Sequence, residues 1–425
     1  MTIWLLILLL TLFALAGAPL FTIIAAIGLL AFTAAGMDTS ALIIELYRLV
    51  DMPALIAVPL FTFAGFILAN SQAPKRMLNL AQSLFGWMPG GLAIVALLST
   101  AIFTAFSGAS GVTIIALGGL IYPALIQHKY PEKFALGLVT TSGSLGLLFP
   151  PSLPIILYSI IAAVNIDKLF MAGLIPGILL IIILSLYGIR TGIVHKVPRI
   201  PFTWKGVYFA LKDAAWEAPL PVVVIGGIYG GIFTATEAAA VTAGYVLIVE
   251  VFIQRELKFF SDLPRVIRES MILVGAILMM LGSALGVTNY LIDEQIPMKM
   301  FALISQYVSS KVIFLIILNL FILIMNMVEI FSAIIIVVPL IVPVAMQYGI
   351  DPVHLGIIFL LNLEIGYMTP PLGLNLFLSS LRFGKPLPEV YRTVLPFFVL
   401  LVIVLLLITY IPQLSLLFVS SGGTP

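Results

Sequence analysis

The feature that most constrains how this chain folds is a series of apolar segments from Ile3 to Phe418. Many approach the roughly 20 residues that a helix needs to span about 30 Å of hydrocarbon. None alternates apolar and polar residues at every second position, as the strands of a membrane β-barrel do. Hydrophobic residues make up 62% of the chain and charged residues 9%, whereas charged residues form about a quarter of a soluble domain. The sequence therefore predicts an all-α polytopic membrane protein.

The apolar runs form two successive sets of six predicted spans. The first set lies near residues 3–16, 19–35, 53–70, 91–125, 134–164 and 169–189. The second set lies near residues 216–233, 235–253, 270–292, 311–346, 354–381 and 393–418. No Lys or Arg precedes the first run, so we expect a retained span rather than a cleaved signal peptide.

Two of these runs contain a double proline, in "GLLFPPSLP" (146–154) and "GYMTPPLGL" (366–374). Proline removes a backbone donor and breaks a helix, and irregular backbone at membrane depth persists only inside protein or beside a water-filled cavity. A simple proline kink, with nearby serines bonded to the preceding turn, is the alternative interpretation. We expect two broken helices. At the first, we expect Thr141, Ser142, Gly143, Ser144 and Gly146 to be unwound, and Pro151 and Ser152 to open the next half-helix.

The two breaks belong to an internal duplication with a constant offset of 220 positions. The matching positions are "LIYP" (120–123) with "LIVP" (340–343), Gln127 with Gln347, Gly146 with Gly366, Pro150–Pro151 with Pro370–Pro371, Ser159 with Ser379, and Pro176 with Pro396. The chain contains 27 prolines in 425 residues, so four coincident prolines in one ungapped register indicate duplication rather than chance.

The basic residues predict the orientation of the two halves. All but four of the 20 Lys and Arg residues can lie on one side of the membrane if the runs 91–125 and 311–346 are re-entrant hairpins; the exceptions are Arg48, Lys168, Lys299 and Lys311. The positive-inside rule makes that side the cytoplasm and places both termini outside. The halves then have opposite orientations, and such inverted repeats are typical of secondary transporters.

The breaks and hairpin tips supply candidate ligands. A broken helix exposes carbonyl groups that suit Na⁺ and N–H groups that suit an anion. The predicted Na⁺ ligands are Ser107, Gly108, Ser110, Ser142, Ser144, Gly146, Asn326, Glu329, Gly366 and Thr369, and the predicted substrate ligands are Ser110, Thr113, Pro151, Ser152, Pro371 and Asn375. The first tip could instead be a small-residue packing surface, and Glu329 could be a protonated or capping carboxyl.

Other features favour structural roles or argue against other functions. Thr234 and Glu237 have capping-box spacing, and Arg76, Lys212 and Arg268 are interpreted as snorkelling cations rather than substrate ligands. The chain has no cysteine and only three histidines, all at predicted span ends, which disfavours a metal centre or an intramembrane enzyme. The sequence contains no continuous stripe of polar residues of the kind that lines the pore of a channel.

The ordered segments "PLFTFAGFILA", "GWMPGGLAIV", "FSGASG", "LGLLFPPS", "GIFTATEAAAV", "NMVEIFSAIIIVVPLIVP" and "YMTPPLGLNLF" carry a resemblance. In this order they resemble the large membrane subunit of the tripartite ATP-independent periplasmic (TRAP) transporters, over nearly the whole chain. The family's usual acid at the second tip is Asp, where this chain has Glu329.

The resemblance implies a fold of the ion-transporter superfamily, in which a transport domain slides against a scaffold as an elevator. The expected parts are scaffold (1–90), transport half one (91–190), connector and scaffold (191–310) and transport half two (311–425). It also implies Na⁺ coupling, a small four-helix membrane subunit, a periplasmic substrate-binding protein, an organic anion substrate and a bacterial or archaeal inner membrane. Nucleic acid and organic cofactors are not expected. A binding-protein-independent Na⁺-coupled anion transporter of the same superfamily is the alternative.

Overall fold

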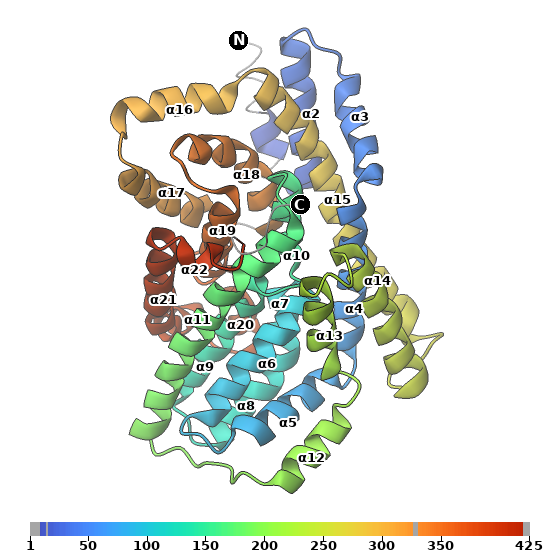
Figure 1. Cartoon of the computed structure of the whole chain (residues 1–425), viewed down its shortest axis with the longest axis vertical. Coiled ribbons are helices and arrows are strands. Elements are labelled where there is room, and N and C mark those ends of the chain that lie inside the picture. Colours follow the sequence, from blue (N-terminus) through green and yellow to red (C-terminus); the bar gives the residue numbers. More distant parts are fainter. Residues whose placement is uncertain (1–8, 14–15, 326–329, 420–425) are drawn as a thin grey trace.

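The computed structural model of the chain describes residues 9–13, 16–325 and 330–419, and its regular elements there are all helices (Figure 1). The first half contains α2 (Leu20–Ala34), α3 (Ser40–Arg48), η1 (Leu49–Asp51), α4 (Pro53–Asn70), α5 (Ala73–Phe85), α6 (Gly91–Ser107), α7 (Ser110–Thr113), η2 (Ile114–Gly118), α8 (Gly119–Gln127), α9 (Glu132–Ser142), η3 (Leu145–Leu148), α10 (Leu153–Ile161), α11 (Ile166–Val194) and α12 (Trp204–Asp213). The second half contains α13 (Pro219–Tyr229), α14 (Ala235–Leu247), η4 (Ile248–Ile253), α15 (Asp262–Asp293), α16 (Ile296–Tyr307), α17 (Lys311–Met325), α18 (Ile330–Gln347), α19 (Pro352–Gly366), α20 (Leu374–Phe383), α21 (Leu387–Tyr410) and α22 (Gln413–Leu416).

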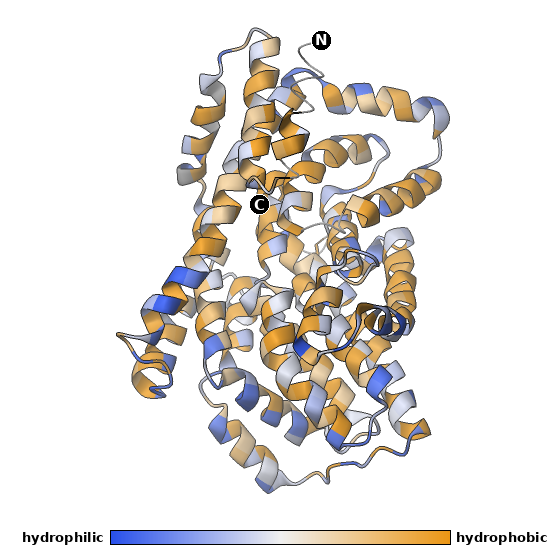
Figure 2. Cartoon of the chain, turned by 180° about the vertical axis from the view of Figure 1, so that it is seen from behind, coloured by the Kyte–Doolittle hydropathy of each residue, from blue (hydrophilic) through white to orange (hydrophobic). Residues whose placement is uncertain are grey.

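The helices are long and apolar enough for a multi-pass membrane protein. In the described part of the chain, seven helices could each cross a membrane, and two bent pairs raise the number to nine. Hydrophobic residues dominate these helices in Figure 2. The basic α5, the α11–α12 connection and the α14–α15 connection all lie in the lower half of the molecule in Figure 1. This shared location agrees with the predicted segregation of positive charge.

The duplication extends to the boundaries of the helices. Helices α6 and α17 begin 220 positions apart, as do α9 and α19, and α8 and α18 end 220 positions apart. The amphipathic helices α5 and α16 precede the two hairpin regions in the same way. The fold is therefore built from two related halves, as the sequence predicts.

Both predicted breaks are present, with two corrections at the first. Helix α9 continues through Ser142, so Thr141 and Ser142 are helical rather than unwound. Helix α10 begins at Leu153 with Ser152 as its N-cap, so Pro151 precedes this half-helix instead of opening it. The two halves of this broken span, Glu132–Leu148 and Leu153–Ile161, meet at 44°.

The last predicted span is wrong at its end. Residues 393–418 were expected to be continuous, but α21 ends at Tyr410 and a short separate helix, α22, follows. Pro412 lies between them, and its missing N–H cannot continue the hydrogen-bond ladder.

Capping of α14 by Thr234 and Glu237 is confirmed, because each side chain accepts a bond from the other residue's backbone N–H.

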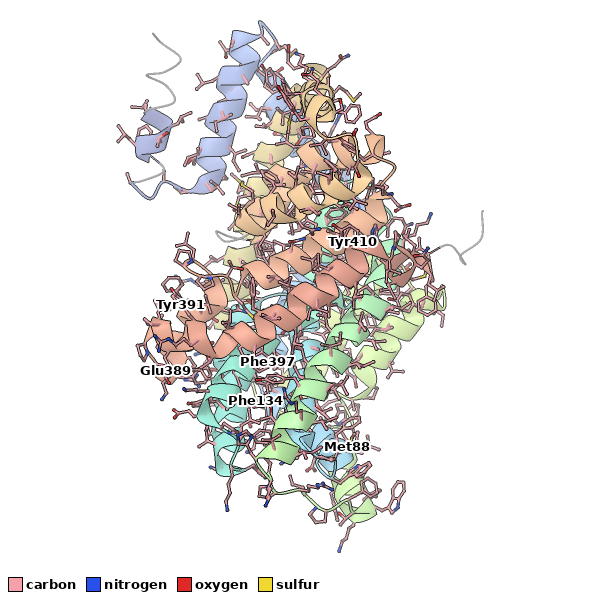
Figure 3. The ribbon with its side chains drawn as sticks, turned by 90° about the vertical axis from the view of Figure 1, so that its left-hand side faces the viewer. Met88, Phe134, Glu389, Tyr391, Phe397 and Tyr410 are labelled. Atoms are coloured by element: carbon pink, nitrogen blue, oxygen red, sulfur yellow. The ribbon has the colours of Figure 1, made fainter. Side chains whose placement is uncertain are left out.

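The packing of the helices positions the first break. Helices α2, α3, α4, α14 and α15 pack on one another, and α6 packs against α5, η3, α11 and α4. Helix α9 packs against α21 through Phe134 and Phe397, whose ring centroids are 5.6 Å apart (Figure 3). The first break is thus enclosed between α6 and the helices of both halves.

Candidate functional site

The first hairpin tip is held against the first break by hydroxyl groups. Helix α6 ends at Ser107, its C-cap Gly108 has a φ of +65° that suits glycine, and α7 starts at Ser110. The Thr104 hydroxyl donates to the Gly143 carbonyl at 2.9 Å and accepts from the Thr113 hydroxyl at 2.7 Å. Thr113, a predicted substrate ligand, is therefore buried and engaged in joining the tip to the break.

Asn375, in the first turn of α20, joins the first tip to both broken helices. Its side-chain oxygen accepts from Ser110 Oγ at 2.9 Å, and its amide donates to the Thr140 carbonyl at 3.2 Å and to Ser144 Oγ at 3.4 Å. Its backbone N–H donates to the Tyr367 carbonyl at 3.1 Å, across the second break. The structure thus brings together three predicted ligands that lie on different elements: Ser110, Ser144 and Asn375.

Gly146 lets the first break approach α6 closely. A Cβ added at this position would lie 2.3 Å from the Ala101 carbonyl oxygen and 2.4 Å from the Ala105 nitrogen. Both are backbone atoms, which cannot rotate away as a side chain can. Any larger residue would therefore push the break away from the hairpin.

Two buried hydroxyls of the first broken helix have no hydrogen-bond partner within the described part of the chain. They are Thr141 Oγ1 and Ser152 Oγ, and both residues are fully buried. The nearby Ser142 and Ser144 hydroxyls donate long bonds, of 3.5 and 3.3 Å, to carbonyls one turn back, and Ser144 Oγ also accepts the 3.4 Å bond from Asn375. An unsatisfied buried polar group is costly, so such groups indicate a bound ion, water or ligand.

The predicted ligands of the second break are not assembled with this site. At the second break, Gly366 is buried, the Thr369 hydroxyl donates to the carbonyl of Ile365 one turn back, and Pro371 is exposed. Ser107 and Gly108 lie at the first tip, where the Ser107 hydroxyl has only a 3.5 Å bond to Ala109. Asn326 and Glu329 lie outside the described residues. The described ligands therefore gather at the first break rather than at the second.

The second half contains a buried polar network that sequence reasoning missed. The Asn362 amide donates to Asn319 Oδ1 at 2.6 Å, and the Asn319 amide donates to Thr409 Oγ1 at 3.3 Å. His354 lies 2.6 Å from Ser415 Oγ through its Nδ1. Asparagine within an apolar run was the available sequence signal, since polar groups at membrane depth need partners.

Glu364 is the buried carboxyl of the second broken helix. It lies near the end of α19 and is fully buried. Neither of its carboxyl oxygens has a hydrogen-bond partner among the residues that the structure describes. An ionisable group at membrane depth is costly and is a functional candidate by default.

The donor atoms at the first break suit a hard monovalent cation. They are hydroxyl, amide and carbonyl oxygens, the ligand type that hard cations prefer. The described residues contain no group of three or more His, Cys, Asp or Glu side chains placed to hold a metal ion. The chemistry available here is binding of ions and polar ligands, without a nucleophile paired with a base.

Comparison with known proteins defines the family. Residues 3–414 match the family model "Tripartite ATP-independent periplasmic transporter, DctM component". The C4-dicarboxylate TRAP transporter large permease protein DctM of Pseudomonas aeruginosa is 37% identical over 88% of each chain. The isethionate TRAP transporter permease protein DctMQ of Oleidesulfovibrio alaskensis is 34% identical over 87% of this chain and 58% of its own length.

A solved structure shares the fold. The Alcanivorax borkumensis YdaH transporter matches with a TM-score of 0.61 at 13% identity, covering 90% of this chain and 88% of its own. At this identity the likeness concerns the fold alone. The family match spans nearly the whole sequence, and the relatives are permease subunits rather than enzymes. This chain therefore belongs to the DctM family and is a large permease subunit of the TRAP transporter type.

Proposed function

We propose that this chain couples entry of Na⁺ to import of an organic anion that a periplasmic binding protein delivers. The observation that carries the proposal is the buried polar junction at the first break, where Asn375 contacts Ser110 and Ser144 beside unpartnered hydroxyls of Thr141 and Ser152. This oxygen-rich site without a carboxylate suits Na⁺ better than a divalent ion.

The half-helix starts support an anionic substrate. Helix α10 begins beside the unpartnered Ser152 hydroxyl, and α20 begins beside Asn375. Backbone N–H groups at a helix start favour negative charge. The two relatives named above are described for C4-dicarboxylates and for isethionate, a sulfonate. We therefore propose a carboxylate or related acid as the substrate class.

The mechanism that we propose is an elevator, in which the two hairpins and broken helices move against a scaffold. Its support is the grouping of α2, α3, α4, α14 and α15, which pack on one another and meet the hairpin helices α6 and α18 through α4 and α15. The proposed partners are a small four-helix membrane subunit and a periplasmic binding protein, both in or at the inner membrane. The tripartite family to which the chain belongs supports this assembly.

Uptake into liposomes tests the coupling. The chain is reconstituted with the two partner subunits, and uptake of a radiolabelled C4-dicarboxylate is measured with an inward Na⁺ gradient. We expect uptake to need this gradient and to be indifferent to ATP. Undiminished uptake with K⁺ replacing Na⁺ on both sides would contradict Na⁺ coupling.

A further inference from the structure

A compact cluster of charges joins helix α5 to three other segments. Arg76 Nη2 lies 2.5 Å from Glu217 Oε1, just before α13, and 3.4 Å from Glu250 Oε2, in the π-helical turn η4 that follows α14. Arg76 Nη1 contacts Glu256, in the α14–α15 connection. The expectation of a snorkelling surface cation is therefore wrong for Arg76, because three carboxylates from distant positions surround it.

The cluster is buried and carries surplus negative charge. The exposed fractions of the side chains are 14% for Arg76, 3% for Glu217, 0% for Glu250 and 19% for Glu256. One guanidinium cannot balance three carboxylates. Like charges confined together at low dielectric repel one another, and a proton kept by one of the carboxyls would relieve that repulsion.

The geometry indicates which carboxyl holds that proton. Glu217 and Glu256 contact the guanidinium closely, whereas both Glu250 oxygens lie 3.4–3.5 Å away. Glu250 is also the most buried of the three. Of the three carboxyls, Glu250 therefore gains the least stabilisation from Arg76 and from solvent when it is ionised.

The cluster grips the start of α5. Glu256 Oε2 accepts from the backbone N–H of Gln72, the N-cap of this helix, at 2.6 Å. A carboxylate at a helix N-terminus also interacts favourably with the helix dipole. Among the residues that the structure describes, the related helix α16 has only the exposed Lys299–Glu294 pair, at 3.5 Å. Helix α5 is thus held in place by buried charges, whereas the related helix α16 is not.

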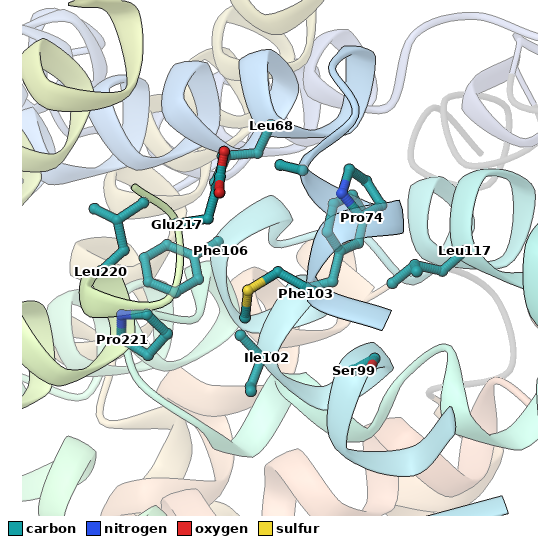
Figure 4. A pocket seen from close by; sticks show the side chains of 12 residues that line it. Leu68, Pro74, Ser99, Ile102, Phe103, Phe106, Leu117, Glu217, Leu220 and Pro221 are labelled. Atoms are coloured by element: carbon teal, nitrogen blue, oxygen red, sulfur yellow. The ribbon is translucent and has the colours of Figure 1, made fainter. Parts of the chain in front are cut away.

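A small cavity lies beside the cluster (Figure 4). Its volume is about 30 Å³, and it is lined by Glu217, by Pro74 of α5, by Phe103 of α6 and by Leu220 of α13. Such a volume admits a water molecule, and Glu217 Oε2 has no hydrogen-bond partner among the described residues. One water molecule would therefore fit beside Glu217, where α5 meets α13.

We propose that these four residues form a proton-dependent anchor that holds α5 against α13 and α14, with Arg76 as its positioning residue and Glu250 as its proton carrier. Loss of the proton adds a third buried negative charge, so the carboxylates repel one another and α5 loosens. Conversely, a neutral Glu250 keeps the anchor closed. The proposal concerns helix α5 and does not depend on the identity of the coupling ion or the substrate.

The other charged or titratable groups near the anchor do not account for a pH response in place of its carboxyls. Burial by itself lowers the pKa of the Arg76 guanidinium, but its bonds to Glu217 and Glu256 raise that pKa above its ordinary value. Arg76 therefore stays charged. Helix α14 also presents Tyr245, whose hydroxyl donates to the Trp216 carbonyl at 2.8 Å. Helices α4 and α6 have no charged residues, and the charged residues of α12 (Lys205, Lys212 and Asp213) form no described ion pair with the cluster.

Spin-label distances on the full chain test the anchor. The chain has no native cysteine, so labels at Asn79→Cys on α5 and Val241→Cys on α14, both exposed positions, report the separation of the two helices. We expect a narrow distance distribution at pH 7 that broadens and lengthens at pH 9. A second pair, Val241→Cys with Ile272→Cys on α15, provides the control and should not change with pH.

Two substitutions separate an anchor from general packing. Glu250→Gln mimics the protonated carboxyl and should keep the distribution narrow at both pH values, whereas Arg76→Met should give the broad distribution at both. An unchanged wild-type distribution between pH 7 and pH 9 would overturn the proposal, as would a pH response in Glu250→Gln equal to that of the wild type. Both of these results can be obtained even if the Arg76→Met variant does not fold.

Discussion

At the scale of single residues, Asn375 is the side chain on which most of the candidate site depends. Its oxygen and its amide hydrogens contact Ser110, Thr140 and Ser144, which belong to three different segments. Ser379, one turn further along α20, makes a single bond to Thr140 Oγ1, which also bonds the Leu136 carbonyl. The two side chains therefore form a matched pair for mutation.

Asn375→Ala should weaken Na⁺ binding and lower stability. It leaves buried polar partners unsatisfied, at a cost of about 1–2 kcal/mol, which corresponds to roughly a tenfold loss of Na⁺ affinity if that cost falls on the bound state. Thermal unfolding at a series of Na⁺ concentrations measures both effects. Ser379→Ala, the control, should shift the melting temperature slightly and leave the Na⁺ dependence intact. Equal Na⁺ dependence in both variants would remove Asn375 from the ion site.

Glu329 yields a prediction that rests on the sequence alone. If its carboxylate helps to hold an ion at the second tip, Glu329→Gln should weaken Na⁺ dependence, whereas Glu329→Asp should retain much activity because the family commonly has aspartate there. A capping role predicts the reverse order, since Gln is the closer isostere. Na⁺-driven uptake at equal protein levels distinguishes the two, and better function of Gln than Asp would defeat the ion-site assignment.

At the scale of elements, the two broken helices differ in their surroundings despite their common origin. Pro150 and Pro151 of the first break are buried, whereas Pro370 and Pro371 of the second are exposed. The first break packs against α6 and α11, and Gly146 makes the approach to α6 possible. The first break therefore has little space for larger side chains.

Gly146→Ala should destabilise the protein strongly. The added methyl group would overlap two backbone atoms of α6, and such overpacking costs about 1–3 kcal/mol or more. Gly244→Ala on α14 provides the control, because its added Cβ meets nothing within 4 Å and alanine favours a helix by roughly 0.5–1 kcal/mol over glycine. Melting temperatures in the same detergent should fall for the first and hold or rise for the second. Equal melting temperatures would show that α6 and the break can separate.

At the scale of the whole molecule, the chain belongs to a family whose members are one component of tripartite transporters. We predict that the chain reconstituted alone will show no measurable uptake of free substrate at micromolar concentration, because in the proposed function the binding protein delivers the substrate. Addition of the small subunit and the loaded binding protein should restore uptake. Robust uptake by the isolated chain would favour the binding-protein-independent alternative.

The sequence alone determined the membrane class, the duplication and the positions of both breaks. These features follow from local chemistry, because apolar length sets a span and a missing proline N–H ends a helix wherever it occurs. Only the tertiary structure decided which residues meet. Ser110 and Asn375 are 265 positions apart, and Arg76 finds its three glutamates only after α5, α13 and the end of α14 have packed. Such contacts depend on the relative placement of helices, which hydrophobic pattern and proline spacing do not specify.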